Sequence, residues 1–219
     1  MAEGSDRRVE SACSAYPSAS RVGDGSSRVL VTNLSGDREE KAYSEEYFAP
    51  VLAVTELPGS GEAFLDAAVA FANSRLSGTL GANLVAHPRT MRELGSRLDD
   101  AIAELRYGTV AVNAWTGVGF LTARASWGAF PGHTADDVQS GIGVVHNALL
   151  LDRVERTVVR GPFRPAPRSL VTGEPALSPR PIWFVTNRTA ASTARKLTYF
   201  TARPRWGALP GIFASALRG

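Results

Sequence analysis

Apolar residues follow two different periods in the first half of the chain. Four short runs rich in Val, Leu, Ala and Thr have the length of buried strands, and they cover residues 28–34, 49–56, 80–86 and 109–113. Apolar residues at 62–76 and 89–106 recur every three to four positions, which predicts two helices. Alternating strands and helices of this length predict right-handed crossovers between parallel strands. We therefore expect an α/β fold with a parallel-sheet βαβαβ core over residues 49–113.

The two ends of the chain differ from this core. Residues 1–27 are rich in Ser, Gly, Arg and Asp and show neither period, so we expect them to be disordered or foreign to the fold. From Pro162 onward, eight of the thirteen prolines are mixed with arginines and aromatic residues, which predicts an extended arm that wraps another surface. The sequence thus divides into an N-terminal segment at 1–27, a central segment at 28–163 and a C-terminal arm at 164–219.

The formal net charge of +3 hides an uneven distribution. Residues 151–219 contain 12 Lys or Arg and 3 Asp or Glu, a balance of +9, which leaves −6 for residues 1–150. A basic segment with aromatic residues can bind nucleic acid or a membrane surface. The preference for Arg over Lys runs through the whole chain, however, so it carries no signal for recognition. We expect a solvated arm or a clamp on an acidic neighbour and no membrane partner, and these interpretations are favoured over binding of nucleic acid.

Several chemistries are excluded by composition and spacing. The single cysteine, Cys13, allows neither an internal disulfide framework nor a cysteine-based zinc site. The histidines His87, His133 and His146 have no metal-ligand spacing, so no metal site is expected. The sequence contains no G-x-S-x-G segment, the motif that carries the nucleophilic serine of many hydrolases, so a hydrolase of that kind is not expected. The first residues lack the apolar stretch of a secretory signal, and no apolar run approaches the roughly 18 residues of a membrane span, so we expect a cytoplasmic protein.

A glycine-rich segment, Gly59-Ser60-Gly61, lies between a predicted strand and a predicted helix, where dinucleotide-binding loops occur. The third glycine of the G-x-G-x-x-G pattern is replaced by Phe64, and no acidic residue follows at the required distance. Ordinary turn chemistry is therefore the expected role of these glycines.

The segment EEYFAPV at 45–51 resembles the E-E-x-F-G-P-V segment of the NAD(P)-dependent aldehyde dehydrogenases, with Ala49 in place of the usual glycine. Four later segments resemble further motifs of that family in the family's order. They are FLDAAVAFAN at 64–73, GTVAVN at 108–113, WGAF at 127–130 and SGIG at 140–143. The resemblance covers residues 28–163 and does not extend to the C-terminal arm. It implies a fold like the C-terminal part of that family's catalytic domain.

The resemblance also implies roles for four residues. In the family, the glutamate of E-x-F holds the hydroxyls of the nicotinamide ribose, and this role falls on Glu46. The family's phenylalanine packs against the nicotinamide, and it falls on Phe48. Asn113 and Trp115 fall where the family lines its substrate tunnel. Without the resemblance, the local sequence favours a turn-capping role for Glu46 and a core position for Phe48.

The implied cofactor is NAD or NADP, and the implied substrate is an aldehyde. The extended segment at 147–163 is similar to the strand through which the family forms oligomers. The resemblance therefore implies a homo-oligomer.

No catalytic residue can be assigned to this chain from the resemblance. The family oxidises aldehydes to acids through a cysteine thiohemiacetal, hydride transfer and thioester hydrolysis. Its cysteine, oxyanion donors, general base and nucleotide-binding domain all precede the E-x-F segment. Here 45 residues precede Glu46, and Cys13 lies too close to it and in a different local sequence. The chain thus resembles the C-terminal third of such an enzyme, and we expect that it does not oxidise aldehydes alone.

Two other classes of function stay open. A non-catalytic interaction module would keep the α/β scaffold and bind a protein partner through its basic aromatic tail. Nucleic-acid binding by the same tail would show a steep salt dependence. Titration with NAD(P) separates the enzyme fragment from the interaction module, because only a residual catalytic lobe would contact nicotinamide.

Overall fold

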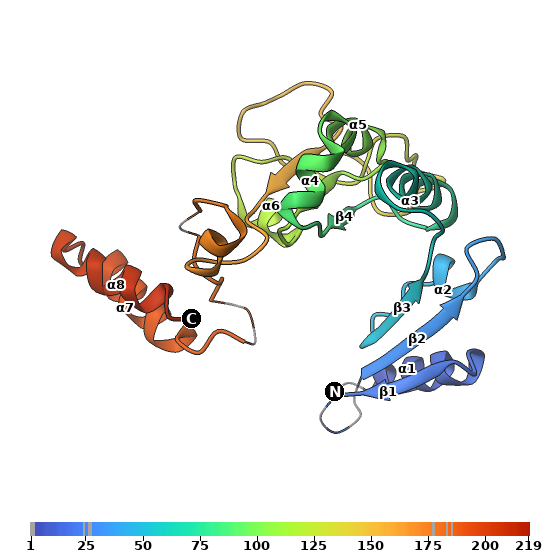
Figure 1. The fold of residues 1–219 in the computed structure, drawn as a ribbon, viewed down its shortest axis with the longest axis horizontal. Helices are drawn as coiled ribbons and strands as arrows, with labels where there is room; N and C mark the ends of the chain where they lie inside the picture. Colours follow the sequence, from blue (N-terminus) through green and yellow to red (C-terminus); the bar gives the residue numbers. More distant parts are fainter. Residues whose placement is uncertain (1–2, 24, 26–27, 177, 183, 185) are drawn as a thin grey trace. The chain divides into compact units, whose positions relative to one another are not determined.

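The computed structural model describes residues 3–23, 25, 28–176, 178–182, 184 and 186–219. The chain divides into two compact units. Unit one comprises Met1–Thr79, Leu94–Arg106 and Gly132–Gly141, and unit two comprises Leu80–Glu93, Tyr107–Pro131 and Ile142–Gly219. Figure 1 shows the strands and helices of both units and labels α1 to α8 and β1 to β4.

Unit one contains a three-stranded sheet in the order β1-β2-β3. Its strands are β1 (Ala19–Val22), β2 (Arg28–Leu34) and β3 (Val51–Thr55). β1 runs antiparallel to β2, whereas β3 runs parallel to it. Helix α1 (Glu3–Ala15) contacts β2 (Figure 1). The core of this region consists of Val9, Tyr16, Val29, Val31, Leu34 and Tyr43.

Two helices of unit one contact each other, α3 (Gly61–Arg75) and α5 (Ser96–Glu104). Their buried side chains include Leu65, Val69, Leu98, Ala101 and Ile102. Arg97 connects the helices, because its guanidinium lies 2.6 Å from the Asp66 carboxylate and 2.9 Å from that of Glu104. The hydrogen bonds to Glu104 and Asp66 raise the pKa of Arg97. The charge of this exposed bridge is therefore permanent, although its contribution to stability is small.

Unit two contains a parallel sheet in the order β4-β5-β8. Its strands are β4 (Gly81–Leu84), β5 (Thr109–Val112) and β8 (Thr157–Arg160). All four residues of β5 are buried, as the centre of a sheet covered on both faces requires. Only glycine fits at position 108, just before β5, because a side chain there would collide with the carbonyl oxygen of Gly128.

The other elements of unit two surround this sheet or follow it along the chain. They are α4 (Pro88–Leu94), α6 (Gly117–Leu121), the antiparallel pair β6 (Trp127–Gly128) and β7 (Val144–His146), the 3₁₀ helices η2 (Arg168–Thr172) and η3 (Trp206–Ala208), α7 (Ala190–Ala202) and α8 (Leu209–Ala216). The last residue of α4 falls within unit one.

The predicted mixed α/β architecture is confirmed, and β4 and β5 are parallel neighbours as expected. The predicted three-stranded sheet within residues 49–113 is wrong in its third member. β3 pairs with β2, and the third parallel strand is β8. The order of strands along the sequence does not specify which distant segment completes a sheet, because that choice depends on non-local packing.

The predicted single helix at 89–106 is also wrong, because α4 and α5 are separate helices. Gly95 lies between them with a φ of 53°. This left-handed conformation interrupts the helix and suits glycine, which has no Cβ to clash with the backbone. The helical periodicity continues across the break, so the pattern of apolar residues did not indicate it.

The expectation that residues 1–27 lack regular structure is contradicted by α1 and β1. Val9 and Ala12 in α1 and Tyr16 after it are buried, at the three- and four-residue spacing of a helix face. Polar residues fill most of the remaining positions, so the segment packs on one side only. Because so few of its residues are apolar, the sequence pattern did not reveal this face.

The expected extended arm is wrong for the end of the chain, where α7 and α8 form a helical hairpin. Thr193 on α7 and Ser215 on α8 are buried, and their hydroxyl oxygens lie 2.9 Å apart. The two prolines of this hairpin lie where helices tolerate them: Pro204 follows α7, and Pro210 occupies the first turn of α8. Neither these helices nor any other in the described residues has the length and apolar character needed to cross a membrane.

Candidate functional site

A cavity of about 760 Å³ lies in unit two, where the parallel strands end. Residues that follow β4, β5 and β8 form one part of its wall, and residues between 178 and 186 form another. Parallel strands bring their carboxyl ends to the same edge of a sheet, and open α/β sheets bind ligands at this edge. The volume is within the range of small-molecule sites. The wall consists of Asn83, Val85, Asn113, Ala114, Trp115, Val118, Val159, Arg160, Gly161, Pro162, Phe163, Pro165, Ser178, Pro179, Arg180, Pro181, Phe184 and Thr186.

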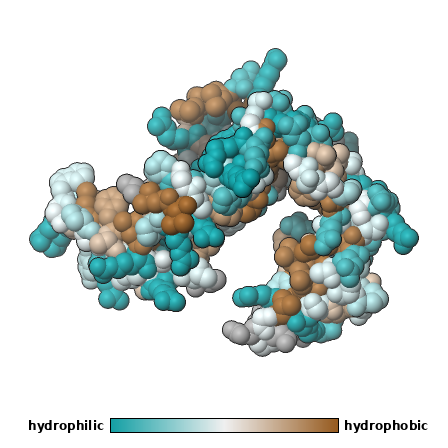
Figure 2. All heavy atoms as spheres, viewed as in Figure 1, coloured by the Kyte–Doolittle hydropathy of each residue, from teal (hydrophilic) through white to brown (hydrophobic). Residues whose placement is uncertain are grey.

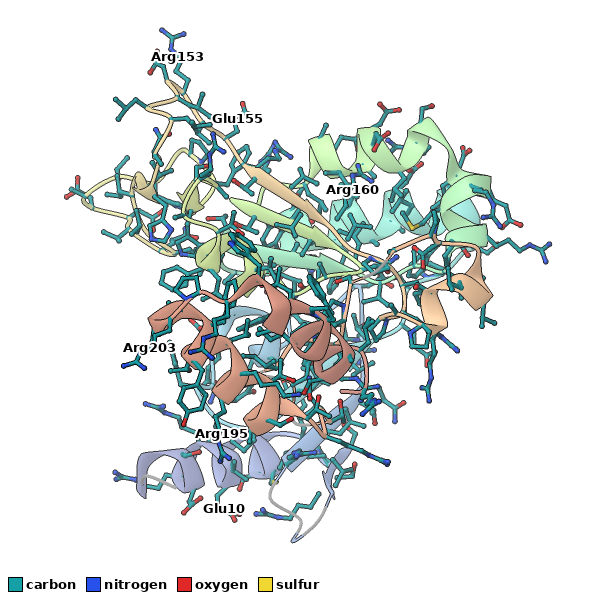
Figure 3. All side chains as sticks on the ribbon, turned by 90° about the vertical axis from the view of Figure 1, so that its left-hand side faces the viewer. Glu10, Arg153, Glu155, Arg160, Arg195 and Arg203 are labelled. Carbon is teal, nitrogen blue, oxygen red and sulfur yellow. The ribbon has the colours of Figure 1, made fainter. Side chains whose placement is uncertain are left out.

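The wall of this cavity is largely apolar, and its charged side chains have one sign. Arg160, at the last position of β8, and Arg180 both line it (Figure 3 labels Arg160). No Asp or Glu belongs to the described residues of the wall. The cavity therefore combines a positive charge with a mostly apolar surface.

Asn113 lines the cavity, but its side chain serves the fold. Its Nδ2 donates a hydrogen bond to the carbonyl of Ala86, and its Oδ1 accepts one from the amide of the same residue, both at 2.9 Å. Asn113 has a φ of 51°, a left-handed conformation that asparagine tolerates better than most residues. The side chain thus joins the end of β5 to the turn that follows β4.

Trp115 is positioned by a similar connection between strand ends. The side-chain oxygen of Asn83 accepts a hydrogen bond of 3.1 Å from the amide of Thr116. The indole of Trp115 lies so close to Gly117 that a side chain at that position would collide with the ring. About 47% of Trp115 is exposed, which leaves indole surface available beside the cavity.

The segment around Arg180 is held by its own polar contacts. Asn187 is buried, and its side-chain amide donates to the carbonyls of Arg180 and Pro181 at 2.9 and 3.2 Å. One guanidinium nitrogen of Arg180 donates to the carbonyl of Thr186 at 2.8 Å. These bonds fix the backbone that carries Arg180 and place its guanidinium in the wall.

Phe163, on the β8 side, is fixed in the same way. Both carboxylate oxygens of Glu174 accept from the amide of Phe163, at 3.0 and 3.2 Å, and Thr172 donates to the same carboxylate at 3.1 Å. The ring of His87 meets the Phe163 ring edge-on at a centroid distance of 5.2 Å. Glu174 therefore orients the aromatic wall without lining the cavity itself.

Glu46 and Phe48 belong to unit one, in the loop that follows α2 (Lys41–Ser44). Phe48 is 72% exposed, so the local interpretation that places it in the core is wrong. The side chain of Glu46 is exposed and has no hydrogen-bond or ion-pair partner among the described residues. The guanidinium carbon of Arg8 lies 5.9 Å from the centroid of the Phe48 ring, a cation–π contact.

Tyr47, between these two residues, anchors the loop. Its side chain is buried, and burial, with smaller contributions from Tyr16 and Glu45, raises the pKa of its phenol. Because Tyr47 points inward, its neighbours on either side face solvent. The loop therefore presents a carboxylate and an aromatic ring two residues apart.

The four residues that the resemblance singles out fall into two pairs. Asn113 and Trp115 lie together in the cavity of unit two, whereas Glu46 and Phe48 lie in unit one. Sequence reasoning missed Arg160 and Arg180. Arg160 lies inside the extended segment expected at 147–163 and could have been noticed there, but Arg180 reaches the cavity from a region without periodicity.

Other candidate chemistry finds little support. In the described ranges, no three residues among His, Cys, Asp and Glu are placed to hold a metal ion. Cys13 is half-buried in α1 and packs against the core of unit one. The Cys13 thiol is therefore only partly accessible to solvent, whereas a reactive thiol needs access to its substrate.

Comparisons with protein-family models, curated proteins and solved structures found no match. The two candidate features therefore stand on their own geometry. They are the cavity at the carboxyl ends of β4, β5 and β8, and the solvent-facing loop around Tyr47.

Proposed function

We propose that residues 28–163 form the C-terminal part of an aldehyde-dehydrogenase-like catalytic domain, in which Glu46 and Phe48 contact the nicotinamide riboside end of NAD or NADP. The observation that carries this proposal is the loop in which buried Tyr47 turns both of its neighbours to solvent. The resemblance of residues 45–51 to the family's E-x-F segment supports the same roles. We expect the protein to act in the cytoplasm.

The residues of the loop fit the group that they would contact. A carboxylate only accepts hydrogen bonds, and that of Glu46 has no partner in the described part of the chain, so it can accept from both ribose hydroxyls. The exposed ring of Phe48 offers a flat surface for the nicotinamide. Bound NAD(P)⁺ would supply the hydride acceptor for aldehyde oxidation.

We also propose that the cavity in unit two provides a wall for the aldehyde substrate. Trp115 would contact the substrate through its exposed indole surface. Asn113 would act indirectly, because its amide is committed to Ala86 and holds the strand ends together. Asn113 is thus a positioning residue in this proposal.

One observation favours the alternative, a protein-interaction module. Tyr199 and Trp206 of the α7–α8 region are 70% and 76% exposed, and Arg195 and Arg203 extend from the same region (Figure 3). Exposed aromatic residues beside arginines are typical of protein-interaction surfaces. Both proposals can hold for one chain, but only the first requires binding of NAD(P).

Titration with NAD⁺ and NADP⁺ tests the cofactor contact. We expect weak binding, with a dissociation constant on the order of 1 mM, because two side chains contribute few contacts. Amide shifts in ¹H–¹⁵N spectra should be confined to residues near 45–49. Glu46→Gln should weaken binding about tenfold, since the neutral amide is a poorer acceptor. Glu62→Gln, which alters an exposed acid in the first turn of α3, should leave it unchanged. Absence of shifts at any accessible concentration would favour the interaction module.

Aldehyde oxidation by the purified chain is expected to be undetectable. Cys13, the single thiol of the chain, packs against the core of unit one, and removal of a covalent nucleophile typically lowers turnover by several orders of magnitude. NAD(P)H formation, followed by absorbance with several aldehydes, should equal the rate without protein. Cys13→Ala should change nothing. Turnover that disappears in Cys13→Ala would assign the nucleophile to Cys13 and refute the proposal.

Self-association is expected because the family resemblance implies a homo-oligomer. Leu149, Leu150 and Leu151 are 53%, 87% and 54% exposed, and Figure 2 shows apolar surface over this loop. Burial of such a group in a contact between copies gains free energy in proportion to its area. Light scattering should give a mass above that of one chain, and Leu150→Lys should lower it. A monomer at high concentration would contradict this expectation.

A further inference from the structure

We infer that the cavity of unit two binds a small organic anion, a carboxylate carried by an aromatic or similarly flat apolar body. This inference rests on the proposed function only in treating this cavity as a place where a small molecule binds. Its evidence is the charge, the shape and the fixed positions of the side chains in the wall.

The charge of the wall favours an anion. Arg160 and Arg180 both line the cavity, and no acidic side chain does so among the described residues. Glu174, the one acid in the sequence from 156 to 219, is engaged with the amide of Phe163 and the hydroxyl of Thr172. The described wall therefore carries positive charge and no carboxylate of its own.

Arg180 can form the direct contact with the anion. Its hydrogen bond to the carbonyl of Thr186 uses one nitrogen of the guanidinium, and the other N–H groups have no partner among the described residues. A guanidinium presents its N–H groups in a planar fork that matches the two oxygens of a carboxylate. The bonds from Asn187 to the carbonyls of Arg180 and Pro181 keep the backbone in place. Arg160 adds a second positive charge to the same wall.

The remainder of the wall indicates the body of the ligand. Trp115 packs over Gly117, and the Phe163 ring contacts that of His87 while Glu174 holds its backbone amide, so other residues of unit two position both aromatic side chains. Val85, Val118 and Val159 line the space with them. A fully hydrated phosphate or sulfate would gain nothing from these surfaces, whereas an aromatic carboxylate would use both parts of the wall.

The test compares two probes of equal shape with the full-length chain. Naphthalene-2-carboxylate carries the charge, and 2-naphthalenemethanol replaces it with a neutral hydroxyl. Binding is followed in ¹H–¹⁵N spectra through the indole N–H signal of Trp115, assigned with Trp115→Phe. The carboxylate should bind at least tenfold more tightly than the alcohol and shift this signal. Inorganic phosphate at equal concentration should not shift it.

Two arginine variants and a control locate the contact. Arg180→Gln should weaken carboxylate binding at least tenfold without altering binding of the alcohol, and Arg180→Lys should restore part of the loss. Arg160→Gln should weaken the carboxylate by a smaller factor. Arg188→Gln removes an exposed arginine outside the cavity wall and should have no effect.

Three results would overturn the inference. They are equal affinity for the two probes, an equal loss of both probes in Arg180→Gln, and a phosphate shift as large as that of the carboxylate. These measurements need neither NAD(P) nor turnover. Carboxylate binding without any NAD(P) response would uphold this inference and refute the proposed function. An NAD(P) response without carboxylate binding would uphold the proposed function and refute this inference.

Discussion

Burial of β5 on both faces is the constraint on which the rest of unit two depends. Thr109, Val110, Ala111 and Val112 are all fully buried, so each backbone N–H and C=O of the strand needs a partner within the protein. β4 supplies partners on one side and β8 on the other. Because both neighbours run parallel to β5, all three strands end at the same edge. The cavity and its side chains are a consequence of this arrangement.

The residues that close the sheet edge also shape the site. Asn113 and Asn83 each bond to the backbone next to a neighbouring strand, and so hold the strand ends in register. Their polar groups are thereby engaged with the backbone, and the wall is largely apolar apart from Arg160, Arg180, Ser178 and Thr186. In the proposed site, the amides therefore have structural roles and the arginines would bind the ligand. Asn113 and Asn83 thus line the cavity while their side-chain amides bond to the backbone.

The parts of the fold that depend on local pattern were predictable, and those that depend on distant pairing were not. β2 has the predicted bounds, and α3 and the β4–β5 pair follow directly from periodicity. The pairing of β8 with β5 joins residues 48 positions apart, and no local signal encodes it. α1 has too few apolar residues to be noticed, yet one buried face is sufficient to fold it onto β2.

The same distinction applies to the candidate site. Glu46 and Phe48 could be predicted because one short motif contains both, and they are exposed on either side of buried Tyr47. Asn113 and Trp115 were found as residues that follow a strand. Arg180 could not be found, because its position in the wall requires the chain to return to the sheet after η2. Binding residues are often on such connecting segments, which local sequence periodicity does not reveal.

Hydrogen exchange of backbone amides tests the parallel pairing of β5 with β8 most directly. The amides of Thr157 and Gly161 donate to the carbonyls of Gly108 and Val112, both at 2.9 Å. They should exchange as slowly as those of Thr109 and Asn113, which donate toward β4, because all four open only when the sheet unfolds. If Thr157 and Gly161 instead exchange as fast as exposed loop amides while β5 stays protected, β8 is not part of the sheet, and the cavity at the sheet edge does not exist.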